Sequence, residues 1–142
     1  GKVYVNGGKS IKGYYKGHFF RSLLEYSFMK HLESIGIDLH VDVDYECFQV
    51  KYTFEDRERT NRPDFYVKSQ NLVYEVKPSY VLKRIPAIQK AKWNAMRELL
   101  LMKGIEFQVV TDRDFLKIAF DVARQDEHVV WKEETFKYFK GS

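Results

Sequence analysis

The chain has 142 residues, which is enough for one domain with a hydrophobic core and too few for two. Hydrophobic residues make up 44% of it, which favours a folded domain over disorder, and the net charge of +4 fits a polyanionic partner. No apolar run approaches the ~20 residues of a membrane span. The single cysteine, Cys47, allows no internal disulfide, which favours a reducing, cytoplasmic setting.

Residues 1–16 are predicted to form a flexible basic arm, followed by a single domain over residues 17–142. The first 24 residues contain no Asp or Glu, and their cations include Lys9, Lys12, Lys16 and Arg21. A glycine-rich cationic segment can follow a DNA backbone, because its flexibility lets each cation reach a phosphate. A solvated tail without a binding role is the alternative.

Residues 20–35 are predicted to form an amphipathic helix, since Phe20, Leu24, Phe28 and Leu32 recur every four residues. Glu25 lies in the first turns of this helix. It stands three residues after Ser22, which is the spacing of a capping box, where the carboxylate binds a backbone N–H group. The second role open to Glu25, in a metal site, depends on the resemblance described below.

Residues 37–54 alternate between apolar and polar side chains and are predicted to form two half-buried strands. Cys47 is expected to be a small buried residue within this strand-like run. The acidic residues Asp38, Asp42, Asp44 and Glu46 occupy the polar phase of the first strand, which indicates a solvated face. Residues 55–61 are predicted to be a charged turn.

Two short apolar runs flank the polar residues 68–71 and predict a β-hairpin. Asp64 precedes its first strand. Glu75 and Lys77 lie two residues apart at the end of the second strand, so they share one face. Charges there are costly to bury unless they are paired or bind a metal, and Mg²⁺ is commonly held by one or two carboxylates. A lysine–carboxylate pair on a solvated edge hairpin is the alternative.

Basic residues also follow this hairpin. Residues 79–86 are predicted to form a loop with Lys83 and Arg84 at its tip, which could clamp DNA. Residues 87–103 are the clearest helix, with Lys90 and Lys92 partly off the apolar stripe and Trp93 expected to be packing. These lysines serve either DNA phosphates or solubility. A buried strand is predicted over residues 105–111, a helix over 111–124, and a short helix or interaction segment beyond.

The pair Pro63-Asp64, followed by Glu75-Val76-Lys77, resembles the signature of the PD-(D/E)xK nuclease superfamily. The predicted element order is similar to its restriction-endonuclease-like αβββαβ core, an α/β (α+β) fold with a mixed central sheet flanked by helices. Residues 20–25 resemble the start of phage junction-resolving endonuclease I. Residues 91–93 and 107–112 resemble transposon end-cleaving endonucleases and phage head-completion nucleases.

The resemblance implies a metal-dependent endodeoxyribonuclease of phage or mobile-element type. Asp64, Glu75 and the Val76 carbonyl would bind Mg²⁺, with Mn²⁺ as a possible substitute, and Glu25 would complete the site. Lys77 would position the attacking water. Gln49 matches a glutamine often found in transposon-type relatives, and its implied contact is either a phosphate or the attacking water.

The implied partner is DNA, with no membrane, in the cytoplasm of a bacterial host or phage-infected cell. A homodimer or a larger phage or transposition assembly is compatible with this reading. The alternative is a catalytically inactive DNA-binding protein, or a structural protein of the phage particle, with a nuclease-like fold.

Overall fold

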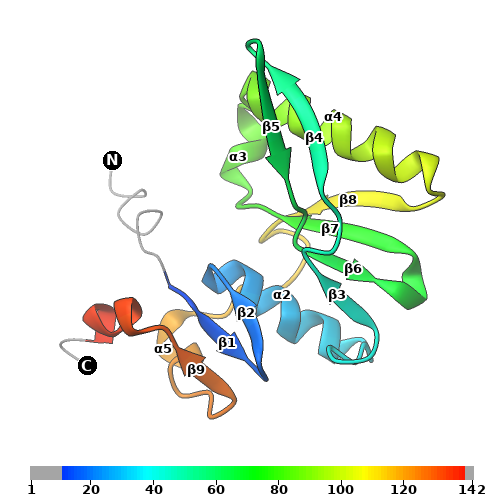
Figure 1. Ribbon diagram of the computed structural model, residues 1–142. Coiled ribbons are helices and arrows are strands. Elements are labelled where there is room, and N and C mark those ends of the chain that lie inside the picture. The colour runs from blue at the N-terminus through cyan, green and yellow to red at the C-terminus, as the bar shows by residue number, and fades with distance from the viewer. Residues whose placement is uncertain (1–10, 140–142) are drawn as a thin grey trace.

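The computed structural model describes residues 11–139, and its centre is a four-stranded mixed sheet in the order β3-β6-β7-β8. Strands β3 (Val43–Tyr45), β6 (Phe65–Val67) and β7 (Leu72–Val76) are antiparallel neighbours. Strand β8 (Glu106–Val110) pairs with β7 in parallel. Figure 1 shows helices on both sides of this sheet. The predicted fold class, a mixed sheet flanked by helices, is therefore confirmed.

The two faces of the sheet are covered by two helices, and this decides where the side chains of β7 point. Helix α2 (Leu23–Ser34) packs Phe28 against Tyr74 on one face. Helix α4 (Ala87–Met102) packs Met96 with Val73 on the other. Successive side chains of a strand alternate between faces, so Glu75 projects toward α4 like Val73.

The predicted hairpin of β6 and β7 is present. Its link is a 3₁₀ turn, η1 (Lys68–Gln70), followed by Asn71 with a left-handed φ of 52°. The Asp42 carboxylate accepts the Ser69 N–H at 2.8 Å and fixes this turn. Phe65 pairs with Tyr74, so the register places the preceding Asp64 beside Glu75.

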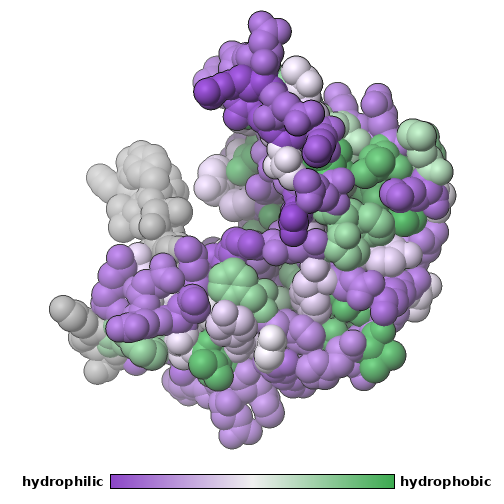
Figure 2. Space-filling view, viewed as in Figure 1, coloured by the Kyte–Doolittle hydropathy of each residue, from purple (hydrophilic) through white to green (hydrophobic). Residues whose placement is uncertain are grey.

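A second hairpin, of β4 (Val50–Phe54) and β5 (Arg57–Asn61), packs on α4 through Val50. The prediction of a turn over residues 55–61 was therefore wrong for residues 57–61, which form β5. Only Glu55 and Asp56 turn, both with positive φ, as two-residue hairpin loops require. The sequence of β5 has no apolar residues, so it lacks the alternation that predicts a strand. Figure 2 shows that the projecting hairpin is largely hydrophilic.

Strands β1 (Gly13–Tyr15), β2 (His18–Phe20) and β9 (Val129–Trp131) form a separate three-stranded sheet in the order β2-β1-β9. Residues 11–16 are thus packed structure where a flexible arm was predicted. Tyr15 is 1% exposed and belongs to the same hydrophobic core as Phe20. The remainder of the predicted arm, including Lys9, lies outside the described residues.

The first predicted strand is much shorter than expected. Residues 37–42 form turns, because the Asp38 carboxylate accepts the backbone N–H groups of His40 and Val41. Val41 is 71% exposed, so the apolar alternation there is not used for burial. Cys47 is exposed in the loop between β3 and β4, which corrects the expectation of a buried cysteine.

The predicted loop over residues 79–86 contains a short helix, α3 (Tyr80–Lys83). The predicted helix over residues 111–124 is reduced to a turn and the short α5 (Phe120–Ala123). The chain then enters β9 and a 3₁₀ segment, η2 (Glu133–Phe139). Among the described residues, no helix combines the length and apolar character needed to span a bilayer.

Candidate active site

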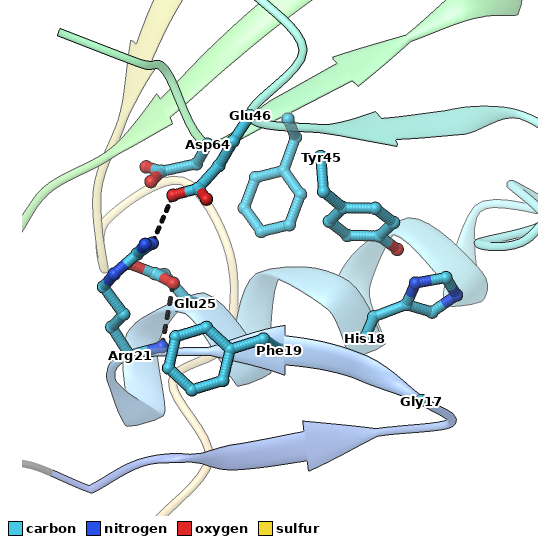
Figure 3. Close-up of a pocket in the computed structure, with 9 residues that line it drawn as sticks. Gly17, His18, Phe19, Arg21, Glu25, Tyr45, Glu46 and Asp64 are labelled. Atoms are coloured by element: carbon cyan, nitrogen blue, oxygen red, sulfur yellow. Dashed lines mark hydrogen bonds and ion pairs between the residues drawn. The ribbon is translucent and has the colours of Figure 1, made fainter.

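A pocket of about 230 Å³ lies where the β2–α2 turn meets the end of β3 and the start of β6. Four charged residues line it: Arg21, Glu25, Glu46 and Asp64. Figure 3 shows their charged groups gathered on one side of the pocket, with Tyr45 on the other. The fold thus brings Glu25 and Asp64 together, although the sequence separates them widely.

Glu25 takes part in capping and in the pocket at once. The Ser22 hydroxyl accepts the Glu25 N–H at 3.1 Å, and Glu25 Oε1 accepts the Arg21 N–H at 3.0 Å. The capping alternative is therefore formed, with Arg21 as the backbone donor. The same carboxylate lines the pocket beside Asp64, so the two roles do not exclude each other.

The neighbouring strand fixes the side chain of Asp64, and its surroundings disfavour the charged form of the carboxyl group. Its Oδ2 accepts the Val76 N–H at 2.8 Å. Burial raises the pKa of Asp64 well above its usual range, and repulsion from Glu25 adds to the effect. Burial likewise raises the pKa of Glu25, against the hydrogen bond from Arg21. Three carboxyl groups and one guanidinium line the pocket, and a bound cation would favour the charged form of these buried carboxyl groups.

Arg21 supplies the counter-charge in this pocket. Its Nη1 lies 2.5 Å from Glu46 Oε2, and Glu25 and Asp64 also act on it electrostatically. Figure 3 shows the Arg21 side chain among these carboxylates. The sequence assigned Glu46 to a solvated strand face, but it follows the end of β3 with a φ of 51° and turns into the pocket.

Glu75 is 3% exposed and is anchored toward α4. Its Oε2 accepts the Trp93 Nε1–H at 3.0 Å and lies 3.7 Å from Lys92 Nζ and 3.9 Å from Lys77 Nζ. Burial lowers the pKa of Lys92, and Glu75 opposes that shift. All three of these contacts fall on Oε2, so the side chain of Glu75 is fixed through this oxygen.

The backbone around Lys77 is fixed at two points. The Lys77 N–H donates to the Val110 carbonyl at 2.9 Å, which extends the parallel pairing of β7 and β8. Two residues later, the Asp112 carboxylate accepts the Ser79 N–H at 2.6 Å. The side chain of Lys77 remains 29% exposed beside Glu75, where it can reach both solvent and a substrate.

The residues fit a hard divalent cation, with one difference from the expected ligand set. Within residues 11–139, no group of three or more His, Cys, Asp or Glu side chains is arranged to hold a metal, since Glu75 is anchored at α4. Mg²⁺ needs only one or two protein carboxylates, with water and phosphate completing its shell. Glu25 and Asp64 supply such a pair. The charges of Glu75 and Lys77 also affect the pKa of Asp64, as does the charge of Glu25. Asp64 therefore interacts electrostatically with all three of these residues.

The predicted DNA-contacting residues fall into different surroundings. Lys12 and Lys16 are paired with Glu134 and Glu33, at 3.8 and 2.7 Å. Gln49 is exposed in the loop before β4 and accepts the Arg62 Nη2–H at 3.0 Å. Of the predicted residues, Lys83, Arg84 and Lys90 are exposed on or beside α3 and α4. DNA contact by these residues stays a prediction.

Sequence reasoning missed the role of Trp93, which was expected to be packing only. Trp93 is indeed only 4% exposed. Its ring N–H also donates to Glu75, at a shorter distance than those of the described ion pairs of Glu75. A buried tryptophan generally finds a partner for its N–H group. A tryptophan on the apolar stripe of a helix that covers a strand with a buried glutamate is therefore a usable signal.

Comparison with known proteins gives one match. A family described as the TnsA-like endonuclease N-terminal domain matches residues 38–112, slightly more than half of the chain. The match includes Asp64, Glu75 and Lys77, and it begins after Glu25. It confirms the resemblance to the PD-(D/E)xK superfamily. Neither the curated proteins nor the solved structures contain a match to this chain.

Proposed function

Because the chain belongs to the TnsA-like endonuclease family, we propose that it cuts DNA at the ends of a mobile element by metal-dependent hydrolysis of a phosphodiester bond. The observation that carries this proposal is the shared pocket of Glu25 and Asp64, with Glu75 and Lys77 adjoining it. Of the two readings of the sequence, phage or mobile element, the family match favours the second.

Glu25 and Asp64 would hold Mg²⁺, or Mn²⁺ in its place, with the Val76 carbonyl as a further oxygen ligand, while Glu75 would act beside this pair through its charge on Asp64. A bound divalent ion would stabilise the negative charge that grows on the phosphate. The Val76 N–H keeps Asp64 oriented. Trp93 and Lys92 do the same for Glu75, because both contact its Oε2.

Lys77 Nζ would hold the attacking water by a hydrogen bond and, as an ammonium, stabilise its hydroxide form. It lies 3.9 Å from Glu75 and keeps partial access to solvent, as such a role requires. Arg21 would leave Glu46 for a DNA phosphate, since a guanidinium binds phosphate as well as carboxylate. Attack in line with the leaving oxygen would then cleave the strand.

The mildly basic chain suits a DNA partner. Two copies, or a larger transposition assembly, would allow both strands to be cut at once, since the described residues form one pocket with Glu25 and Asp64. We place this activity in the cytoplasm of the bacterial host, where its DNA substrate lies.

The test is cleavage of supercoiled plasmid and of linear duplex, flap and four-way-junction DNA, each with Mg²⁺, Mn²⁺ or EDTA. We expect nicking or cutting with either metal and none with EDTA. Asp64→Ala and Lys77→Ala should abolish cleavage, while DNA binding in Ca²⁺ survives. The matched control is Lys68→Ala, because Lys68 is exposed at the opposite end of the same hairpin.

Full activity of Asp64→Ala or Lys77→Ala would refute the assignment of the site. DNA binding without cleavage under every metal condition would instead favour the inactive DNA-binding alternative.

A further inference from the structure

A second groove, of about 480 Å³, lies between α3, α4 and β8. Its volume falls within the range of roughly 300–1,000 Å³ that is usual for small-ligand sites. We propose that this groove binds an unpaired nucleotide of the DNA next to the cleavage site. This proposal rests on the proposed nuclease function and names a further part of its substrate.

The charge of the groove matches a nucleic-acid strand. Lys90 and Arg97 of α4 line it, and no Asp or Glu does. Lys83 and Arg84 stand immediately beside Leu82 and Ile85, which form its α3 side. Two cations thus line this concave surface and two more adjoin it in the sequence, which favours a polyanion over a neutral or basic peptide.

The remaining lining suits a base. Asn94 offers an amide donor and acceptor, and Trp93 and Phe107 contribute aromatic surface beside the aliphatic residues. The Arg97 guanidinium lies over the Phe107 ring, 5.4 Å from its centroid. Single-stranded nucleic acids are bound by such surfaces, where bases stack on aromatic rings or guanidinium planes and cations neutralise phosphates.

The groove adjoins the candidate active site through one residue. Trp93 lines the groove with its ring, while its N–H holds Glu75. Strand β8, which carries Phe107 and Gln108, is the edge of the four-stranded sheet in the described part of the chain, and it pairs directly with β7. Trp93 and the pairing of β8 with β7 thus link the groove to the strand that carries Glu75 and ends beside Lys77.

The experiment measures binding by fluorescence anisotropy, with the whole chain in Ca²⁺. The two probes are a labelled blunt duplex and the same duplex with a short unpaired tail. We expect Arg97→Ala to weaken binding of the tailed duplex about tenfold, the effect of losing roughly one stacked base. Binding of the blunt duplex should change less than twofold.

The control is Lys103→Ala, which removes one positive charge just after the opposite end of α4, outside the groove. It should leave both affinities unchanged. An equal loss on both duplexes in Arg97→Ala would reduce Arg97 to a general phosphate contact and overturn the proposal. No loss on either duplex would also overturn it and leave the groove to a protein partner. Selective loss of tailed-duplex binding by a protein that never cleaves would refute the proposed function but keep the groove.

Discussion

Trp93 Nε1 donates a hydrogen bond to Glu75 Oε2 at 3.0 Å, in the buried space between α4 and β7. The contact joins the one glutamate of the Glu75-Val76-Lys77 motif to the helix that covers it. It fixes one oxygen of the carboxylate. The orientation of Glu75 is thus set by α4 as much as by its own strand.

Replacing Trp93 by Phe removes this donor and keeps most of the ring. Because the acceptor is a buried carboxylate, we expect a loss of about 1.5–3 kcal/mol in the free energy of unfolding or in transition-state stabilisation. Cleavage should slow about tenfold or more at saturating DNA, with DNA affinity in Ca²⁺ unchanged. Trp131→Phe is the control, since Trp131 lies in β9 among Phe20, Phe120 and Phe139. An undiminished cleavage rate in Trp93→Phe would show that the hydrogen bond does not position Glu75.

Asp64→Asn should stabilise the metal-free protein near neutral pH. The folded-state pKa of Asp64 is raised by burial and by Glu25, so the folded protein retains a proton that the unfolded chain has lost. The free energy of unfolding therefore falls as pH rises above the ordinary value of 3.8 toward the raised pKa. Asn carries no charge and avoids this loss.

Thermal unfolding in EDTA at several pH values measures the effect. The melting temperature of Asp64→Asn should exceed that of the unaltered protein at pH 7. The difference should shrink as the pH approaches 3.8. It should vanish below that pH, where Asp64 of the unaltered protein is protonated in both the folded and the unfolded state. A difference that is constant with pH would point to a cause other than the charge of Asp64.

Lys92 and Glu75 should be energetically coupled, because their charged groups lie 3.7 Å apart and both are largely shielded from water. Lys92→Met leaves Glu75 with less counter-charge and should cost about 1–3 kcal/mol. In a double-mutant cycle, Glu75→Gln should cost less stability in the Lys92→Met protein than in the unaltered protein. We expect a coupling energy of about 0.5–3 kcal/mol. Urea unfolding gives the four values.

Lys90→Met is the matched control for this cycle, since Lys90 is exposed on the same helix. Its effect should stay within about 0.5 kcal/mol, as is usual for surface changes. Additive costs for Lys92→Met and Glu75→Gln would mean that their ion pair contributes nothing to stability.

Gly13→Ala should destabilise the sheet of β1, β2 and β9. A Cβ atom at Gly13 would lie 2.8 Å from the Val130 carbonyl oxygen and 3.0 Å from Phe20 Cζ. Overpacking of this kind costs about 1–3 kcal/mol. The control is Gly17→Asn, because nothing lies within 4 Å there and Asn tolerates its φ of +84°. If Gly13→Ala proved neutral in urea unfolding, the close pairing of β1 with β9 would be refuted.

The sequence predicted the central elements well where the residues of one segment show a clear strand or helix pattern. The hairpin of β6 and β7 and helix α4 follow from short apolar runs and a strong helical period. The helix predicted over residues 111–124 failed, although its apolar spacing is real. There Asp114 accepts the Thr111 N–H, and the Ile118 N–H donates to the Ser27 hydroxyl of α2 at 2.8 Å. A local side-chain contact and a distant one with α2 thus take the backbone N–H groups that a helix would use for its own hydrogen bonds.

The amino-acid order alone determined the family, the mixed sheet and the closeness of Asp64 to Glu75 and Lys77, because a two-residue strand period and a short turn fix those positions locally. Only tertiary packing decided that Glu46 and Arg21 join Glu25 and Asp64 in one pocket, and that Glu75 faces Trp93 and Lys92. The physical reason is that a buried carboxylate takes whichever donors the rest of the fold brings to it, and those donors lie on other elements.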